Sequence, residues 1–287
     1  MKKWFGYGWM ALMLVACTLD NPTPTDQVCL VTELVQSQQQ QEVSRQMFQY
    51  QNGKLIGYTD QTANRTLSFR FNYAGGKVAS AYTSDQSIVL SLEYDEFERI
   101  IKASYLVDNK ERTVFSLHYA SNDRAERLVK IVETRVMLPT NSFIASRTFQ
   151  FSYREVAYQA EDLVSESVQN GYRDGSRSEE EFTFEQDAAN HSPFYDASQP
   201  IVLALLALTN QTDSNAARYL QRFDCRSFTH QVTDSNGTVV RQEANRFSTE
   251  YDGHFNPLRS TRQIQISIPN DSAEQSIQYS YQYECIE

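Results

Sequence analysis

Histidines, cysteines and acidic residues are the side chains of this sequence most able to do chemistry, and their spacing predicts no catalytic centre. The four histidines are far apart and form no HExxH zinc pair; they are His118, His191, His230 and His254. The sequence also lacks the GxSxG turn of serine hydrolases and a glycine-rich phosphate loop. We therefore predict a protein that is not an enzyme and that has no catalytic, metal or cofactor site.

Two polar segments are the candidates for an exception. The acidic run at residues 179–181 lacks the alternating Asp/Asn spacing of a calcium loop, so a solvated strand entry is the favoured interpretation. His191 lies beside Pro193 in an irregular stretch and is the first polar position to inspect. A histidine satisfied by turn backbone is favoured there.

The N-terminus combines a short apolar run with a cysteine that can be modified. Lys2 and Lys3 precede an uncharged segment that ends in small residues and in Cys17, the arrangement of a bacterial export signal. Its ending, Leu-Val-Ala-Cys, resembles a lipobox, which implies cleavage before the cysteine and attachment of a diacylglycerol to its thiol. An ordinary secretory signal is the alternative, and a spanning helix is disfavoured because it needs about 20 apolar residues. We expect residues 1–16 to be a lipoprotein signal peptide and Cys17 to be lipidated.

Lipidation predicts that the chain meets a membrane through its anchor alone. Several acyl chains give stable anchoring, because each buried CH₂ contributes about 0.8 kcal/mol. Without Lys2 and Lys3 the chain has 24 basic against 36 acidic residues, a balance that disfavours nucleic acid and anionic headgroups. Residues 17–28 are rich in Thr, Pro and Asn, which indicates a lipidated flexible tether. The remaining residues, 29–287, are expected to form one domain.

Three cysteines remain for that domain: Cys29, Cys225 and Cys285. An exported chain meets an oxidising compartment, so one disulfide and one free thiol are expected. The spacings fit no zinc site. A bridge that involves Cys29 is preferred, since a curved meander commonly brings its first and last strands together. Either of the other two cysteines fits as its partner, and the pairing stays open.

A short sequence pattern recurs along the first half of the domain. Each copy has Phe or Leu two residues before a Tyr, then turn residues, then a basic and an aliphatic residue. The Tyr anchors are 23, 21 and 25 residues apart, at Tyr50, Tyr73, Tyr94 and Tyr119. Large side chains two positions apart share one face of a strand, and turns such as Asn52-Gly53 adopt positive φ cheaply. One copy is therefore one β-hairpin.

Successive hairpins predict an all-β fold. A hairpin cannot bury its apolar face alone, so its neighbours must stack. We interpret the rows of Tyr and Phe as core rather than as an exposed stacking platform. The predicted fold is an antiparallel meander of repeated hairpins, strongly curved or partly closed. The Gln-rich residues 36–41 are its weakest part and are expected to be an edge strand or a mobile loop.

The hairpin rhythm stops near residues 193–223. Residues 201–208, IVLALLAL, form an apolar octet that fits a buried helix or a buried strand. Asp213-Ser214 can cap a short helix that continues to Arg222. We expect one short helical or irregular insertion here that plugs one end or face of the sheet.

One copy resembles a known repeat. Tyr94-Asp95-Glu96-Phe97-Glu98-Arg99-Ile100 resembles the YD repeat of RHS-type proteins, Tyr-Asp-x-x-Gly-Arg-Leu/Ile, with Glu98 in place of the glycine. The lipobox, the degenerate hairpins and residues 187–195, which resemble an Asn-Pro-Phe-containing insertion, are together similar to the DUF4595-like lipoproteins of Bacteroidota-type bacteria. This resemblance implies a β-rich fold and a location in the cell envelope, and it implies no known activity.

These observations favour a non-catalytic, lipid-anchored cell-envelope protein of the outer membrane with a binding or scaffold role. Its partners are then the membrane, through the lipid on Cys17, and an envelope protein or glycan. The alternative is an accessory glycan-binding lipoprotein of an outer-membrane uptake system, which requires an exposed aromatic cluster. Both tryptophans, Trp4 and Trp9, lie in the signal, which counts against this alternative. A hydrolase is less favoured still, since it requires a cleft with converging acids or a histidine pair.

Overall fold

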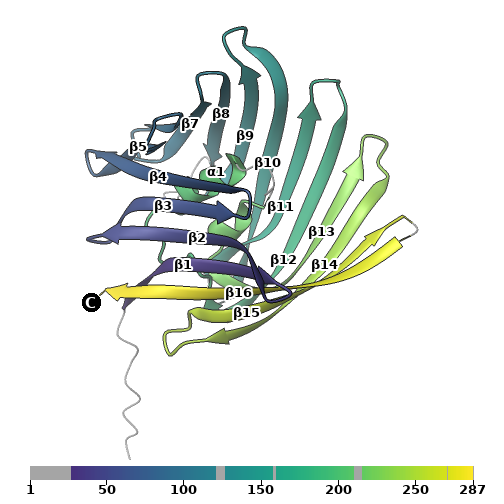
Figure 1. Cartoon of the computed structure of the whole chain (residues 1–287). Coiled ribbons are helices and arrows are strands. Elements are labelled where there is room, and N and C mark those ends of the chain that lie inside the picture. The colour runs from purple at the N-terminus through teal and green to yellow at the C-terminus, as the bar shows by residue number, and fades with distance from the viewer. Residues whose placement is uncertain (1–26, 121–126, 158–159, 210–214, 270, 287) are drawn as a thin grey trace, which may run out of the picture.

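The computed structural model describes residues 27–120, 127–157, 160–209, 215–269 and 271–286. They form a closed antiparallel barrel of 16 strands, each hydrogen-bonded to the next along the chain, with β1 pairing with β16 (Figure 1). The strands are β1 (Val28–Gln38), β2 (Gln41–Gln51), β3 (Lys54–Thr62), β4 (Arg65–Ala74), β5 (Lys77–Thr83), β6 (Ile88–Tyr94), β7 (Ile100–Val107), β8 (Glu111–Tyr119), β9 (Leu128–Met137), β10 (Ser142–Ala157), β11 (Ala160–Tyr172), β12 (Arg177–His191), β13 (Phe223–Asp234), β14 (Val239–Tyr251), β15 (Pro257–Ile268) and β16 (Asp271–Ile286). The predicted all-β meander is confirmed, and its closure is complete.

The tyrosines of the repeat join neighbouring hairpins. After Tyr50, the hydroxyl of each repeat tyrosine, and that of Tyr153 in a further copy, donates to the carbonyl of the aliphatic residue that opens the return strand of the preceding copy. The basic residue beside that aliphatic residue lies over the same ring in three of these pairs. The hydrogen bonds are Tyr73 to Leu55 (2.8 Å), Tyr94 to Val78 (2.7 Å), Tyr119 to Ile100 (2.9 Å) and Tyr153 to Leu128 (3.0 Å), and the cations are Lys54, Lys77 and Arg99. The recurring sequence pattern therefore specifies contacts between neighbouring hairpins.

The YD-like turn keeps its geometry without a glycine. Glu98 has a φ of +68°, the left-handed conformation that glycine adopts at least cost. Asp95 Oδ1 accepts hydrogen bonds from the backbone amides of Phe97 and Arg99, at 3.0 and 2.9 Å, and Asp95 Oδ2 forms an ion pair with the Arg99 guanidinium at 2.7 Å. These contacts offset the backbone cost at Glu98.

The barrel has two ends, which we call proximal and distal. The proximal end holds Val28, where β1 begins, and Ile286, where β16 ends. Cys29 lies opposite Cys285 in the β1–β16 register, and a disulfide joins them, with their Cα atoms 4.0 Å apart. Cys225 carries a free thiol.

The distal end holds the opposite set of hairpin turns, including the β1–β2 turn. The Gln-rich residues 36–41 form that hairpin end, with β1 reaching Gln38 and β2 beginning at Gln41. The edge-strand interpretation is wrong, because β1 has partners on both sides once the sheet closes.

The insertion between β12 and β13 contains the helix α1 (Pro200–Thr209) and the 3₁₀ turn η1 (Ala217–Tyr219), and it lies inside the barrel (Figure 1). Pro suits the first helical position, and the following Leu and Ala residues are strong helix formers. All residues from Val202 to Leu208 are buried, as expected for a helix that is apolar on every side. Asp213 and Ser214 lie outside the described residues. No helix in the described part of the chain combines the length and apolar character needed to cross a membrane.

The two faces of the barrel wall differ sharply in polarity. Phe and Tyr side chains point inward along most strands and are buried or half-buried. The alternating outward positions are mainly polar and exposed, with a few apolar exceptions such as Ile101. Outward examples are Arg70, Asn72, Glu179, Glu181, Arg246, Gln263, Gln278 and Gln282. This arrangement is the reverse of that in membrane-spanning barrels, which carry an outward apolar band and a polar interior.

Candidate ligand-binding cavity

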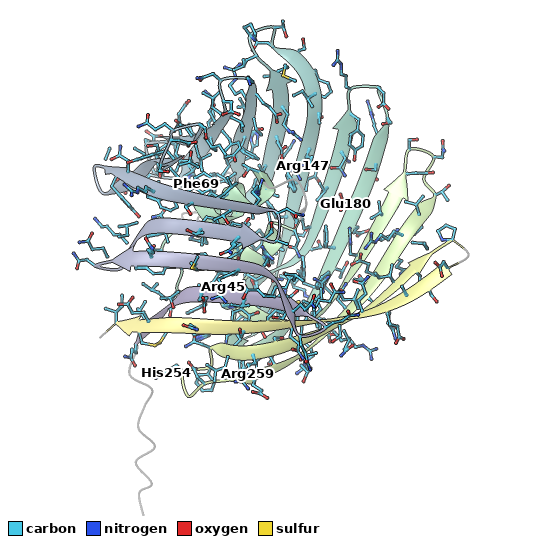
Figure 2. The ribbon with its side chains drawn as sticks, in the orientation of Figure 1. Arg45, Phe69, Arg147, Glu180, His254 and Arg259 are labelled. Carbon is cyan, nitrogen blue, oxygen red and sulfur yellow. A yellow bond between two sulfur atoms is a disulfide. The ribbon has the colours of Figure 1, made fainter. Side chains whose placement is uncertain are left out.

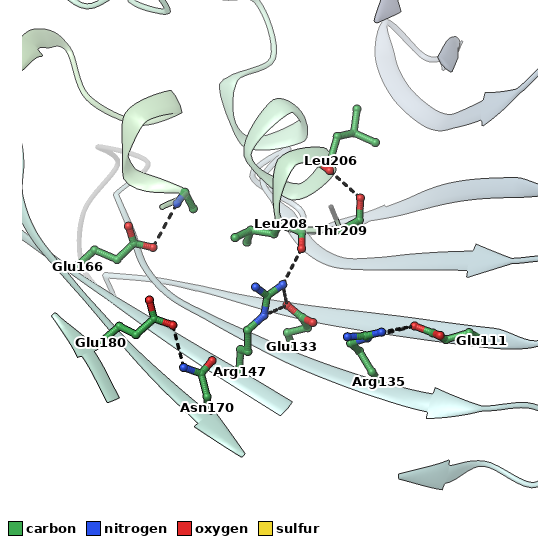
Figure 3. A network of polar contacts seen from close by, with 11 residues as sticks. Glu111, Glu133, Arg135, Arg147, Glu166, Asn170, Glu180, Leu206, Leu208 and Thr209 are labelled. Carbon is green, nitrogen blue, oxygen red and sulfur yellow. Dashed lines mark hydrogen bonds and ion pairs between the residues drawn. The ribbon is translucent and has the colours of Figure 1, made fainter. Parts of the chain in front are cut away.

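A barrel of 16 strands is too wide for wall side chains alone to fill, and the insertion occupies part of the lumen. We call residues 192–209 and 215–222 the plug. One anchor of the plug is Arg147 on β10, which donates from Nη2 to the Leu208 carbonyl at 2.6 Å and forms an ion pair with Glu133 at 2.6 Å (Figure 3). Burial raises the pKa of Glu133, and the adjacent Arg147 opposes that rise. The pair thus fixes the end of α1 against the wall.

Two more buried carboxylates hold the returning part of the plug. Glu166 accepts hydrogen bonds from the backbone amides of residues 216 and 217, at 3.3 and 3.2 Å. Asp162 accepts from the amides of residues 222 and 223, at 2.9 and 3.0 Å. These acids satisfy backbone donors that the irregular segment leaves without secondary-structure partners. Their role is therefore to position the plug.

Between the plug and the wall formed by β12–β16 and β1 lies a cavity of about 390 Å³. This size lies within the range of about 300–1,000 Å³ that is typical of small-molecule sites. The cavity reaches the solvent, since Arg241 belongs to its lining while 48% of the Arg241 side chain is exposed. Arg241 lies near the start of β14, so the opening is toward the distal end.

A continuous row of aromatic rings forms one wall of the cavity. The rings come from β12, β13, β14 and β16, and their centroids are 5.8 to 6.4 Å apart from each ring to the next. The row is Phe182, Phe184, Phe228, Phe247 and Tyr279. These are the inward positions of the repeated strands, so the pattern that builds the core also lines the cavity.

A charged cluster lies at the distal edge of this row. The His230 ring stacks on Phe182 at 4.1 Å, and its Nε2 lies 2.9 Å from Glu180 Oε2. Glu243 contacts Arg241 at 2.5 Å and His230 at 3.8 Å. The contact with His230, reinforced by Arg241, lowers the pKa of Glu243 to about 2. Burial alone would lower the pKa of His230, but Glu180 and Glu243 outweigh burial and raise it.

Arg262 on β15 presents its guanidinium to the middle of the cavity. It lies over the Phe228 ring at 4.8 Å, and its Nε donates to Asn245 Oδ1 at 2.8 Å. Its terminal nitrogens have longer contacts, 3.4 Å to the Tyr279 hydroxyl and 3.8 Å to Glu243. The outer edge of the guanidinium therefore retains donor capacity.

The proximal part of the cavity is formed by Asp224, Cys225 and the plug residue Gln221. Burial raises the pKa of Asp224 to about 6, although the Tyr251 hydroxyl donates to its Oδ2 at 2.8 Å. Burial likewise raises the pKa of the Cys225 thiol, which disfavours the nucleophilic thiolate. Within the described residues, no three His, Cys, Asp or Glu side chains are grouped so as to hold a metal ion.

The other histidines lie away from the cavity. His118 is exposed on the outer wall, and the amide of His254 donates to Asp252 in the β14–β15 turn; Figure 2 shows His254 at that edge of the barrel. His191 stacks on Tyr195 at 4.2 Å, and its amide donates to the Phe255 carbonyl at 3.1 Å. His191 thus packs at the proximal end rather than joining a polar site.

The charged cluster is not apparent from the sequence when residues 179–181 are taken as one solvated unit. Glu179 and Glu181 do point outward, but Glu180 points into the lumen and contacts His230 and Asn170. The available signal was the period of two, since Glu180 shares its parity with Phe182.

No described protein family and no curated protein sequence matches this chain. Among solved structures, a porin-like protein from Bacteroides uniformis is similar, with a TM-score of 0.54 and 12% identity over 90% of this chain and 96% of that one. A porin-like protein from Bacteroides vulgatus has a TM-score of 0.54 and 10% identity over 89% of this chain and 98% of that one. At these identities the similarity concerns the fold.

Proposed function

We propose that this protein is a non-catalytic, lipid-anchored binding protein of the cell envelope, held at the outer membrane by Cys17, and that the cavity in the barrel is its binding site. The observation that carries the proposal is the aromatic-lined space of about 390 Å³, open toward the distal end. Membership of the DUF4595-like lipoproteins is part of the same proposal.

The polarity of the wall supports attachment by a lipid rather than by insertion of the barrel. Its outward face is rich in charged and amide side chains, which are costly against hydrocarbon. An acylated cysteine ahead of the barrel needs no apolar outer band. The porin-like proteins share the fold, and we infer that this chain meets the membrane through its lipid.

The state of the cavity acids supports binding rather than catalysis. Glu243 is paired with Arg241, and Glu180 is bonded to His230 and Asn170. Asp224 accepts from Tyr251, and the adjacent thiol is held protonated by burial. This arrangement leaves no base next to an activated nucleophile among the cavity residues described.

The anchor is tested by replacing Cys17 with Ala in the full chain. We expect loss of radiolabelled lipid incorporation and release of the protein from washed membranes. A Cys17→Ala chain that stays lipid-labelled and membrane-bound would disprove the anchor.

The cavity is tested with phenylnaphthylamine (NPN), a neutral aromatic dye whose fluorescence rises in apolar sites. The chain from residue 18 onward contains all 16 strands and closes on itself, so it is used for binding. We expect Phe247→Ala to weaken NPN binding about three- to tenfold, because an aromatic contact contributes about 0.5–1.5 kcal/mol. Phe97→Ala, at an exposed hairpin tip, is the matched control and should bind NPN normally. Equal effects of the two variants, or no NPN binding, would overturn the proposed site.

A further inference from the structure

We infer that the cavity selects amphiphilic organic anions, meaning small molecules with a flat apolar body and one acidic group such as a carboxylate or sulfonate. This inference rests on the proposed function, and it names the class of ligand. It combines three features of the cavity: an aromatic wall, an excess of arginine, and buried donors that face the space.

The apolar body is matched by the aromatic row. Phe228 and Phe247 lie with centroids 6.0 Å apart, and Tyr279 follows at 6.4 Å from Phe247. Together with Leu34 from β1 they border the same space. A flat ring system covers such a surface with offset or edge contacts, which a small inorganic anion would not use.

The acidic group is matched by the local charge. Three arginines line the cavity, Arg218, Arg241 and Arg262, against two carboxylates, Glu243 and Asp224. Burial raises the pKa of Asp224 to about 6, so its charge is lost only as the pH falls below neutral. Glu180, just beyond the lining, is engaged by Asn170 and His230. The residues that line the cavity therefore carry one more formal positive than negative charge, in a protein whose formal net charge is −10.

Arg262 is the group best placed to receive the anion. Its Nε is fixed by Asn245, and its plane lies over Phe228, so the side chain is oriented before any ligand arrives. The longer contacts of its terminal nitrogens leave a planar edge that can donate two parallel bonds to a carboxylate or sulfonate. Since Phe228 belongs to the aromatic row, an acid bound at Arg262 lies next to the rings of Phe247 and Tyr279, which can receive the apolar body of the same molecule.

Gln221 supplies an independent indication of a polar ligand atom. Its side chain lines the cavity, only 5% of the residue is exposed, and its Nε2 has no hydrogen-bond partner among the described residues. A buried amide donor without a partner is costly. An acceptor oxygen on a bound molecule would relieve that cost.

The test compares NPN with anilinonaphthalenesulfonate (ANS), which carries the same aromatic skeleton plus a sulfonate. On the chain from residue 18 onward we expect ANS to bind more tightly than NPN, and rising sodium chloride to weaken ANS but not NPN. Arg262→Gln should weaken ANS about tenfold or more, as expected for loss of charge-assisted hydrogen bonds, and should leave NPN within about twofold. Arg246→Gln, on the outer face of β14, is the matched control and should change neither.

The outcomes separate this inference from the proposed function. If NPN binds and responds to Phe247→Ala while ANS shows neither tighter nor salt-sensitive binding, the anion selectivity is wrong and the binding site stands. If neither dye binds, both are overturned. Retained NPN affinity shows that Arg262→Gln is folded, and the salt dependence of the unaltered chain decides the matter if that variant does not fold.

Discussion

The hydrogen bond from Tyr94 to the Val78 carbonyl allows a direct test of the claim that the repeat tyrosines link neighbouring hairpins. The hydroxyl lies 2.7 Å from that carbonyl oxygen, in a setting where burial raises the pKa of Tyr94 to about 12. Tyr94→Phe removes one oxygen and keeps the ring, and Lys77 still lies 5.4 Å from the ring centroid. The variant therefore isolates the link between two hairpins.

The expected cost is that of one intramolecular hydrogen bond, about 1–2 kcal/mol in the free energy of unfolding, because the Val78 carbonyl also loses an acceptor interaction in a half-buried place. In urea, with a slope near 2–3 kcal/mol per molar, this corresponds to a fall in midpoint of about 0.5 M. Unfolding is followed by circular dichroism on the oxidised protein.

Tyr50 is the internal control, since it belongs to the same repeat but has no preceding copy to bond. Its hydroxyl is buried and has no hydrogen-bond partner in the described part of the chain. Tyr50→Phe removes an unsatisfied polar atom and should leave stability unchanged or raise it. Equal midpoints for Tyr94→Phe and Tyr50→Phe would refute the proposed link between hairpins.

Three further predictions concern the disulfide, the plug and a buried acid. Cys285→Ser removes the bridge to Cys29 and should lower stability by up to roughly 5 kcal/mol in the chain-entropy model; titration of the unreduced, unfolded parent should find one thiol, that of Cys225, and three thiols would contradict the bridge. Arg147→Met removes the ion-pair partner of the buried Glu133 carboxylate together with the bond to the Leu208 carbonyl, and should cost about 3–5 kcal/mol, measured by urea unfolding; a change below 1 kcal/mol would show that the plug does not depend on this anchor. The folded pKa of Asp224, about 6, lies above its unfolded value, so the folded state binds more protons between these values and the group favours folding increasingly as pH falls from 7 toward 4. Asp224→Asn should reduce the change in the free energy of unfolding between pH 7 and pH 4 by at most about 3 kcal/mol, as measured by urea unfolding at each pH. An unchanged pH dependence would show that other groups cause it.

The parts of the fold that depend on local sequence pattern could be predicted. Alternation of large and polar residues predicted the hairpins, and the short insertion predicted near 193–223 lies between β12 and β13 and contains α1. Whether IVLALLAL forms a helix or a strand depends on surroundings that the sequence does not contain. Closure between β1 and β16 pairs strands whose cysteines are 256 residues apart in the sequence. The register of that pairing places Cys29 opposite Cys285 rather than Cys225.

The cavity was less accessible to prediction, because its residues come from six strands and the plug. Arg262, Gln221 and His230 are unremarkable in sequence and acquire their relation only when the barrel closes. Parity within a strand would have placed Glu180 and Phe182 on one face. It could not have shown that this face borders an unfilled space.

The position of the disulfide has a mechanical consequence. If the chain is held by the lipid anchor proposed at Cys17, a pull on it enters the barrel at Val28, where it would peel β1 away from β2 and β16 one hydrogen bond at a time. Only the Val28–Ile286 pair precedes Cys29 in the β1–β16 register, so the disulfide passes the load to β16 before the rest of the strand pairing must break. The disulfide thus holds the β1–β16 pairing at the end where the force is applied, and the load is shared between the first and last strands.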